Sequence, residues 1–151
     1  MSSRLYDWLD SRLNLKPVQR TLLDEPIPGG ASWIYVFGSI TLFLFLMQAA
    51  TGMFLALYYA PTPDHAYDSV RFIETDITLG WFVRGLHHWG ASSMVVAIGL
   101  HMLQTFLYGA YKAPREVMWM VGVLLFLLVM TFAFTGYLLP WDQTAYWATQ
   151  I

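Results

Sequence analysis

Three histidines and one arginine interrupt a long apolar stretch of the sequence. The segment RGLHHWGASSMVVAIGLH, residues 84–101, contains Arg84, His87, His88 and His101. His87 and His101 are 14 residues apart, so in a helix they return to within roughly 40° of the same face, about 21 Å apart along the axis. Imidazole is a common metal ligand, but this separation is too large for one ion. The spacing therefore predicts two cofactor sites at two depths of one helix.

Glycines elsewhere in the sequence repeat this 14-residue interval. Two other apolar segments each hold one such pair, Gly38 with Gly52 and Gly122 with Gly136. If consecutive segments cross a membrane in opposite directions, the second glycine of each pair lies level with His87 and the first lies level with His101. Glycine lets a bulky group approach a helix backbone. A flat ligand such as haem therefore fits, with its iron on an imidazole and its ring against glycine. Plain helix packing is the alternative explanation for paired glycines.

Three long charge-free stretches, each with a strongly apolar segment, would position these side chains. Of the 151 residues, 57% are hydrophobic and only 12% are charged, which is too little charge to cover a soluble domain. We predict helices at about 33–59, 81–110 and 117–140, each longer than the roughly 20 residues that cross a hydrocarbon core. The fold class is therefore an all-α membrane protein. The absence of cysteine excludes disulfides, cysteine-ligated metals and thioether-linked cofactors.

A more polar region, residues 1–25, precedes the predicted membrane domain, residues 26–151. In this region apolar residues recur at helical spacing among charged ones: Leu5, Trp8, Leu9 and Leu13. The pattern predicts an amphipathic helix, followed by a linker, that lies on the cytoplasmic membrane surface or docks on a partner protein. Residues 61–76 contain prolines and several acidic side chains, and we predict a loop there between the first two membrane helices.

The distribution of charge predicts the orientation in the membrane. Cations gather before the first helix and between the second and third: Arg4, Arg12, Lys16, Arg20, Lys112 and Arg115. The opposite side is mainly acidic. The positive-inside rule then places the N-terminus and the loop around residue 112 on the cytoplasmic side of the membrane. The net charge of −2 gives no indication of a nucleic-acid partner.

Four motifs carry a resemblance to a known family: GWFVRGLHHWGAS, the later LH at residues 100–101, YKAPRE and GYLLPWDQTAYW. With them the chain resembles the N-terminal part of cytochrome b of the bc1 and b6f complexes, and it is closer to the b6 branch. The resemblance implies a four-helix bundle with two b haems, one ligated by His87 near the outer side and one by His101 near the inner side. It also implies haem contacts for other residues: Gly38, Gly52, Gly122, Gly136, Arg84 at a propionate and Gln48 near the outer haem.

In that family, quinol is oxidised near the outer side of the membrane. One electron goes to a Rieske iron–sulfur protein and then to a c-type cytochrome or equivalent acceptor, while the other crosses through the haems to reduce quinone near the inner side. The resemblance thus implies a quinol oxidoreductase subunit in a dimeric complex, in the bacterial inner membrane. It implies a quinol pocket bordered by Tyr137, Pro140 and Trp141. An interfacial aromatic belt is the alternative explanation for the two aromatic residues.

The sequence departs from the family pattern at several positions. Val36 stands where the b6 branch has a cysteine that binds an extra covalent haem, so no thioether forms there. Gln104 replaces an arginine, which leaves Lys112 and Arg115 as candidate partners of the inner propionates. For His88 we expect either a propionate, interfacial or supporting contact, or plain packing.

The family's fourth helix, which brings two more histidine ligands, has no counterpart within these 151 residues. His65 and His88 do not lie at the depths required of the missing ligands. We therefore expect the second ligand of each haem to come from a continuation of the polypeptide or from a separate chain. Two other classes compete with this interpretation: a proton or ion transporter that uses the intramembrane histidines and arginine, and a membrane anchor without cofactors.

Overall fold

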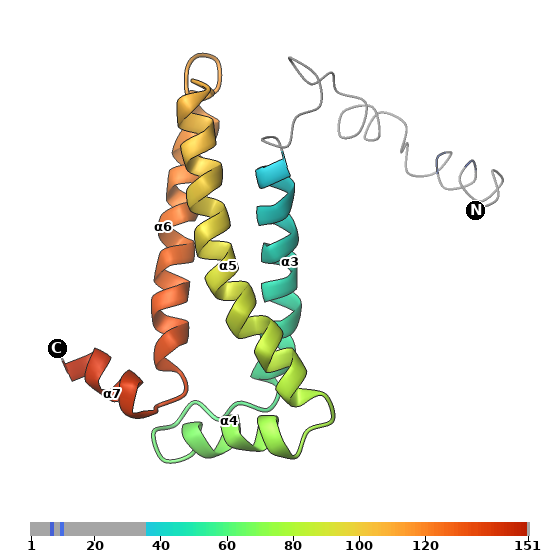
Figure 1. Cartoon of the computed structure of the whole chain (residues 1–151), viewed down its shortest axis with the longest axis vertical. Helices are drawn as coiled ribbons and strands as arrows, with labels where there is room; N and C mark the ends of the chain where they lie inside the picture. The colour runs from blue at the N-terminus through green and yellow to red at the C-terminus, as the bar shows by residue number, and fades with distance from the viewer. Residues whose placement is uncertain (1–6, 8–9, 11–35, 151) are drawn as a thin grey trace. The chain divides into compact units, whose positions relative to one another are not determined.

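The computed structural model describes residues 7, 10 and 36–150 of the chain (Figure 1). Within residues 36–150 the chain forms helices and no strand: α3 (Val36–Ala56), α4 (Ala66–Thr75), α5 (Gly80–Leu107), α6 (Glu116–Leu138) and α7 (Gln143–Gln150). All of these belong to one of two compact units, residues 33–151. Asp7 and Asp10 are helical, while the rest of the predicted amphipathic helix lies outside the described residues.

Three of these helices, α3, α5 and α6, are long and apolar enough to cross a membrane. They confirm the prediction of an all-α protein with three membrane helices. α3 ends at Ala56 and α5 at Leu107, about three residues before the predicted ends. After α5 the chain turns at Gly109, whose φ of 65° is a left-handed conformation that glycine adopts without strain. Residues 33–35 of the first predicted helix lie outside the described part.

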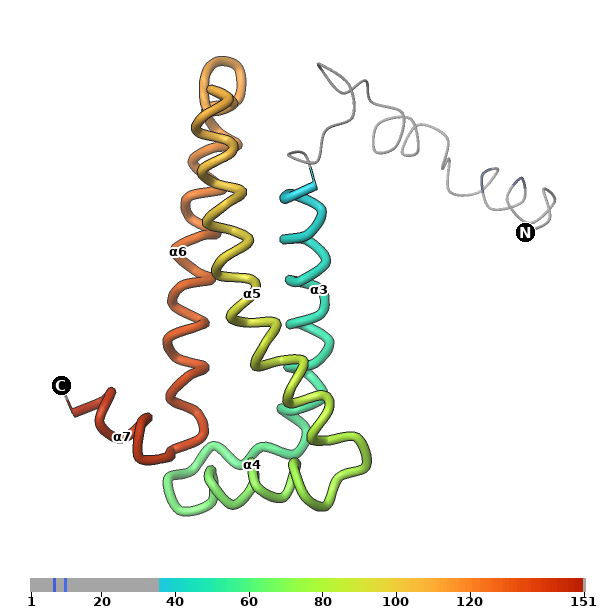
Figure 2. Tube along the Cα trace, viewed as in Figure 1, coloured from blue at the N-terminus to red at the C-terminus, as the bar shows by residue number. Residues whose placement is uncertain are grey.

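The central helix is α5, which contacts α3, α4 and α6 (Figures 1 and 2). Its contact with α3 is the most extensive one. Gly90 makes this contact close, because a Cβ there would collide with the side chains of Met47 and Gln48. By contrast, no residue of α6 is buried against the other described helices. The membrane core of the described region is therefore the α3–α5 pair.

The segment predicted as a loop between the first two membrane helices contains a helix, α4, so that prediction was wrong. α4 buries Ala66 and Ile73, seven residues apart and so on one face. Gly80, the first residue of α5, contacts the backbone carbonyl of Ile73 so closely that a Cβ would collide with it. This close approach docks α4 across the beginning of α5, as Figure 2 shows.

Two hydrogen bonds stabilise the segments that follow α3 and α6. The hydroxyl of Tyr59, which follows α3, donates to the carbonyl of Leu139 at the end of α6, at 2.7 Å. Burial raises the pKa of Tyr59, so this donor hydroxyl stays protonated to a higher pH than that of a free tyrosine. The carboxylate of Asp142 accepts a hydrogen bond from the backbone N–H of Ala145 at 2.8 Å and so caps the N-terminus of α7.

Candidate functional site

Both predicted ligand histidines lie on the side of α5 that contacts α3. A Cβ built on Gly52 would lie 3.2 Å from Cε1 of His87, and one built on Gly38 would lie 3.3 Å from Cε1 of His101. The two helices are antiparallel, so glycines and histidines at the same interval meet at both depths. The spacing predicts this arrangement for α3, with Gly52 level with His87 and Gly38 level with His101. Each imidazole therefore fits against a stretch of bare helix backbone.

Polar groups of α3 surround His87. The hydroxyl oxygen of Thr51 lies 2.9 Å from Nδ1 of His87. One turn earlier, the side-chain amide of Gln48 donates to the backbone carbonyl of His87 at 2.9 Å. Gln48 was expected near the outer cofactor, and the structure brings it to the level of His87. Thr51 was not predicted, although its position next to Gly52 could have indicated it.

His101 has different surroundings. Its Nδ1 is buried and has no hydrogen-bond partner among the described residues. The side-chain oxygen of Gln104, one turn further along α5, is also buried without a partner in this part of the chain. Unpartnered buried polar atoms are costly and indicate that a group outside the described residues completes the site.

The glycines of α6 are not brought against the imidazoles. A Cβ on Gly122 or on Gly136 would meet nothing within 4 Å. The backbone of α6 at both positions is therefore open to a large partner, whereas the glycines of α3 already contact His87 and His101.

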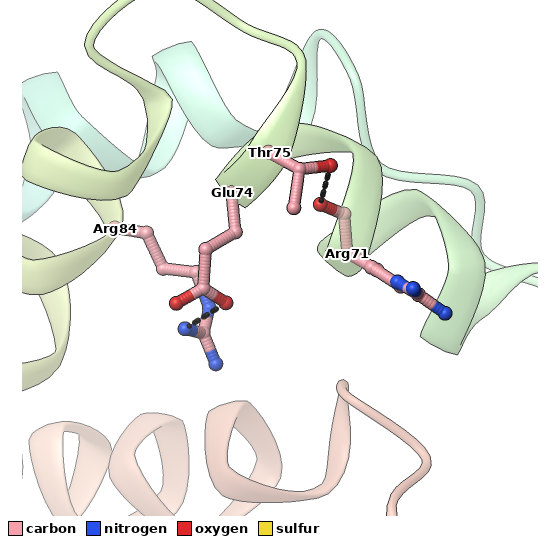
Figure 3. Close-up of polar contacts among 4 residues, drawn as sticks. All are labelled: Arg71, Glu74, Thr75 and Arg84. Carbon is pink, nitrogen blue, oxygen red and sulfur yellow. Dashed lines mark hydrogen bonds and ion pairs between the residues drawn. The ribbon is translucent and has the colours of Figure 1, made fainter.

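Near the N-terminal end of α5, Arg84 forms an ion pair with Glu74 of α4 (Figure 3). Its Nη1 lies 2.8 Å from Oε2 of Glu74, and the two side chains are 40% and 49% exposed. They line a pocket of about 240 Å³ together with residues of α4 and of the α6–α7 connection: Tyr67, Val70, Arg71, Pro140 and Asp142. The partner of Arg84 in this structure is thus the carboxylate of Glu74, and its expected contact with a haem propionate stays a prediction. Glu74 was not identified from the sequence.

The predicted quinol-pocket residues separate in the structure. Pro140 lines the pocket beside Arg84. Tyr137 and Trp141 are exposed and do not line it. The geometry brings one of the three residues to the pocket and leaves the two aromatic residues on the surface.

The remaining candidates lie on the surface. Lys112 and Arg115 are exposed in and after the α5–α6 turn, and Nζ of Lys112 lies 6.0 Å from the centre of the Tyr111 ring. His88 is exposed and meets the ring of Trp89 edge-on. His65 is exposed just before α4.

The donor set fits haem better than a bare metal ion. In the part of the chain that the structure describes, no three histidine, cysteine or acidic side chains lie close enough to hold a metal. His87 and His101 each offer a single imidazole, and haem supplies the four equatorial nitrogens itself and needs only axial ligands. The membrane helices and the imidazole–glycine pairs thus fit the class of membrane-embedded cytochromes of the b type.

Comparison with known proteins identifies the family. The cytochrome b/b6/petB family model matches residues 22–151. The cytochrome b subunit of the menaquinol:cytochrome c reductase of Geobacillus thermodenitrificans is 44% identical over 158 residues, which cover 100% of this chain and 70% of that protein. Cytochrome b6 of Synechococcus sp. strain JA-3-3Ab is 44% identical over 149 residues, covering 99% of this chain and 69% of the relative. The chain belongs to the cytochrome b/b6 family, whose cofactor is haem b.

A solved structure agrees with this identification. A chain of a hyperthermophilic respiratory complex III superposes with a TM-score of 0.86 at 39% identity. The match covers 93% of this chain and 36% of the solved chain, so this chain spans about a third of that protein. The likeness extends to nearly all of the described helices.

Proposed function

We propose that this chain binds two b haems, ligated by His87 near the outer side and by His101 near the inner side. Electrons then cross the membrane between quinol oxidation and quinone reduction in a bc1- or b6f-like complex. The observation that carries the proposal is the meeting of two imidazoles on α5 with two glycines on α3 at matching depths. Haem iron, when bound, supplies one-electron oxidation and reduction.

The chain's own residues fix the position and surroundings of the cofactors. His87 and His101 would each ligate one haem iron, and the bare backbone at Gly52 and Gly38 gives each imidazole its place against α3. Gly122 and Gly136 of α6 would leave room for the edge of a large flat ligand, because a Cβ at either position meets nothing within 4 Å. Nδ1 of His101 and the side chain of Thr51 are buried, which would keep water away from the Nδ1 side of each imidazole.

Charged groups would hold the haem propionates. Arg84 is suited to the outer haem because it already pairs with a carboxylate at that end of α5. Lys112 and Arg115 are exposed near the other end of α5 and would serve the inner haem. By the positive-inside rule this cationic end faces the cytoplasm of a bacterial inner membrane.

The rest of the assembly supplies what these residues do not. We infer that a segment outside the 151 residues brings the second histidine of each iron, on a fourth helix. Further partners are a Rieske iron–sulfur protein, a c-type cytochrome or equivalent acceptor, and a second copy of the complex. The relatives' names, menaquinol:cytochrome c reductase subunit and cytochrome b6, support this class of partners. Pro140 and the pocket beside Arg84 would border the quinol site, together with Tyr137 and Trp141.

The test is a reduced-minus-oxidised optical spectrum of the purified complex. We expect two b haems, with His87→Ala losing only the outer haem and His101→Ala only the inner one. His65→Ala, at an exposed histidine away from the membrane helices, is the matched control and keeps both. A complex that contains no haem b, or that keeps both haems in both ligand variants, would contradict the proposal. It would favour the alternatives, a membrane anchor without cofactors or a proton or ion transporter.

A further inference from the structure

The hydroxyl of Thr51 makes two short contacts. Its oxygen lies 2.7 Å from the backbone carbonyl of Met47 and 2.9 Å from Nδ1 of His87. Thr51 is only 9% exposed and is the one buried polar or charged side chain of the described region. Both contacts therefore form away from water, where an unsatisfied or misplaced proton is costly.

The two contacts together determine where the imidazole proton lies. A hydroxyl has one hydrogen to donate, and a carbonyl oxygen has none. Two oxygens 2.7 Å apart repel unless a hydrogen lies between them, so Thr51 donates its hydrogen to Met47. The same oxygen can then only accept from His87, which must carry a hydrogen on Nδ1. Nε2 is consequently left with a free lone pair, the state required of a metal ligand.

This arrangement has no counterpart at the inner site. The 14-residue register that relates Gly52 to Gly38 relates Thr51 to Phe37, whose side chain has no hydrogen-bonding group. Accordingly, Nδ1 of His101 has no partner among the described residues. The two imidazoles share their glycine contacts but differ in the group that faces Nδ1.

We propose that Thr51 is a positioning residue that fixes His87 in the Nδ1–H tautomer and strengthens Nε2 as an electron-pair donor to the outer haem iron. A hydrogen-bond acceptor on Nδ1–H raises the basicity of the imidazole. A more basic ligand stabilises ferric over ferrous iron, so Thr51 lowers the reduction potential of the outer haem. This inference rests on the proposed function, because it requires haem at His87.

The experiment is a potentiometric titration of the haem b bands in the assembled complex. Thr51→Val keeps the shape of the side chain and removes the hydroxyl. We expect the reduction equilibrium constant of the outer haem to rise about three- to tenfold, which is about 28 to 59 mV because a tenfold change is 59 mV for one electron. The inner haem keeps its potential. Thr51→Ser, which retains a hydroxyl, restores the outer potential.

Thr41→Val is the matched control. Thr41 also lies on α3 and donates to a backbone carbonyl, that of Gly38, at 2.8 Å, but makes no hydrogen bond to an imidazole. It should leave both potentials unchanged. If Thr51→Val loses the outer haem, retention of that haem in Thr51→Ser supports the requirement for a hydroxyl.

Two outcomes overturn the inference. One is an outer haem whose potential does not move in Thr51→Val. The other is equal loss of the outer haem in Thr51→Val and Thr51→Ser, which would assign Thr51 a packing role. Neither outcome contradicts the proposed function, which is tested separately by the haem content of the complex and of its His87→Ala and His101→Ala variants.

Discussion

Each imidazole of α5 meets the backbone of α3 at a distance that leaves no room for another carbon. A Cβ on Gly52 would lie 3.2 Å from His87, closer than most carbon contacts, so the ring would have to move by a few tenths of an ångström. Overpacking of this kind costs about 1 to 3 kcal/mol. These contacts therefore predict which of the two haems is affected when each glycine is replaced.

Gly52→Ala should weaken binding of the outer haem by roughly 5- to 150-fold, the equivalent of that overpacking cost. The inner haem should be retained at its normal level. The measurement is the content of each b haem in the purified complex, resolved by its optical band. Gly99→Ala is the control, because a Cβ there meets nothing within 4 Å. Selective loss of the inner haem in Gly52→Ala would show that the assignment of depths is reversed.

How far the site could be predicted differs from residue to residue. The contact of Gly52 with His87 follows because the glycines of α3 and the histidines of α5 have the same spacing on antiparallel helices. Both spacings can be read from the sequence. The contact between Thr51 and Nδ1 depends on the rotation of α3 about its axis and on one side-chain rotamer. Neither follows from spacing. The pair of Arg84 with Glu74 depends on how α4 docks, which the sequence pattern did not reveal.

Among the elements, α4 depends on one close contact. Gly80→Ala would place a Cβ against the carbonyl of Ile73, a backbone atom that cannot rotate away. We expect a loss of about 1 to 3 kcal/mol, towards the upper end, in the docking of α4 on α5. Hydrogen exchange across residues 66–75 would report it as faster exchange, with the rest of α5 unchanged.

Gly85→Ala provides the comparison for that variant. It lies on the same helix, and a Cβ there meets nothing within 4 Å. Alanine is favoured over glycine in a helix by about 1 kcal/mol. Exchange in α4 should therefore stay the same or slow slightly. Equal effects from both substitutions would mean that helix propensity, and not the contact with Ile73, governs α4.

The start of α7 depends on a side-chain cap. Asp142→Ala removes the acceptor for the N–H of Ala145 and should cost about 1 kcal/mol of helix stability. Asp142→Asn, which keeps a side-chain oxygen, should cost less. Limited proteolysis between residues 141 and 150 measures the effect. Unchanged cleavage in Asp142→Ala would mean that contacts with the rest of the assembly hold α7 in place.

The membrane helices could be predicted because their signal is local. Each is an apolar run longer than the membrane is thick, and no tertiary contact is needed to detect it. α4 is different, since half of its ten residues are polar or charged and it follows two prolines. Its helix is stabilised by burial of Ala66 and Ile73 against other elements. An element of this kind is determined by the fold around it, and reading the sequence segment by segment gives a loop.

At the scale of the whole molecule, apolar surface is distributed in a way that a soluble protein would not tolerate. α6 exposes most of its large apolar side chains, among them Leu124, Leu128, Phe132 and Phe134. A lipid bilayer and neighbouring helices of the assembly both account for such a surface. The charged residues lie near or beyond the ends of these helices, with Arg84 at the start of α5 and Glu116 at the start of α6. Their distribution between the two ends therefore determines the direction of insertion.

The orientation can be tested directly because the sequence contains no cysteine. Ala113→Cys introduces an exposed thiol between α5 and α6, and Thr62→Cys introduces one between α3 and α4. Lys112 and Arg115 beside the first position and acidic residues beside the second predict opposite sides of the membrane. A membrane-impermeant maleimide added to intact spheroplasts should label Thr62→Cys and leave Ala113→Cys unlabelled until the membrane is opened. The reverse pattern would place His87 and its Thr51 partner near the cytoplasm. The haem assigned as outer would then be the inner one, while the chemistry argued for each ligand would remain.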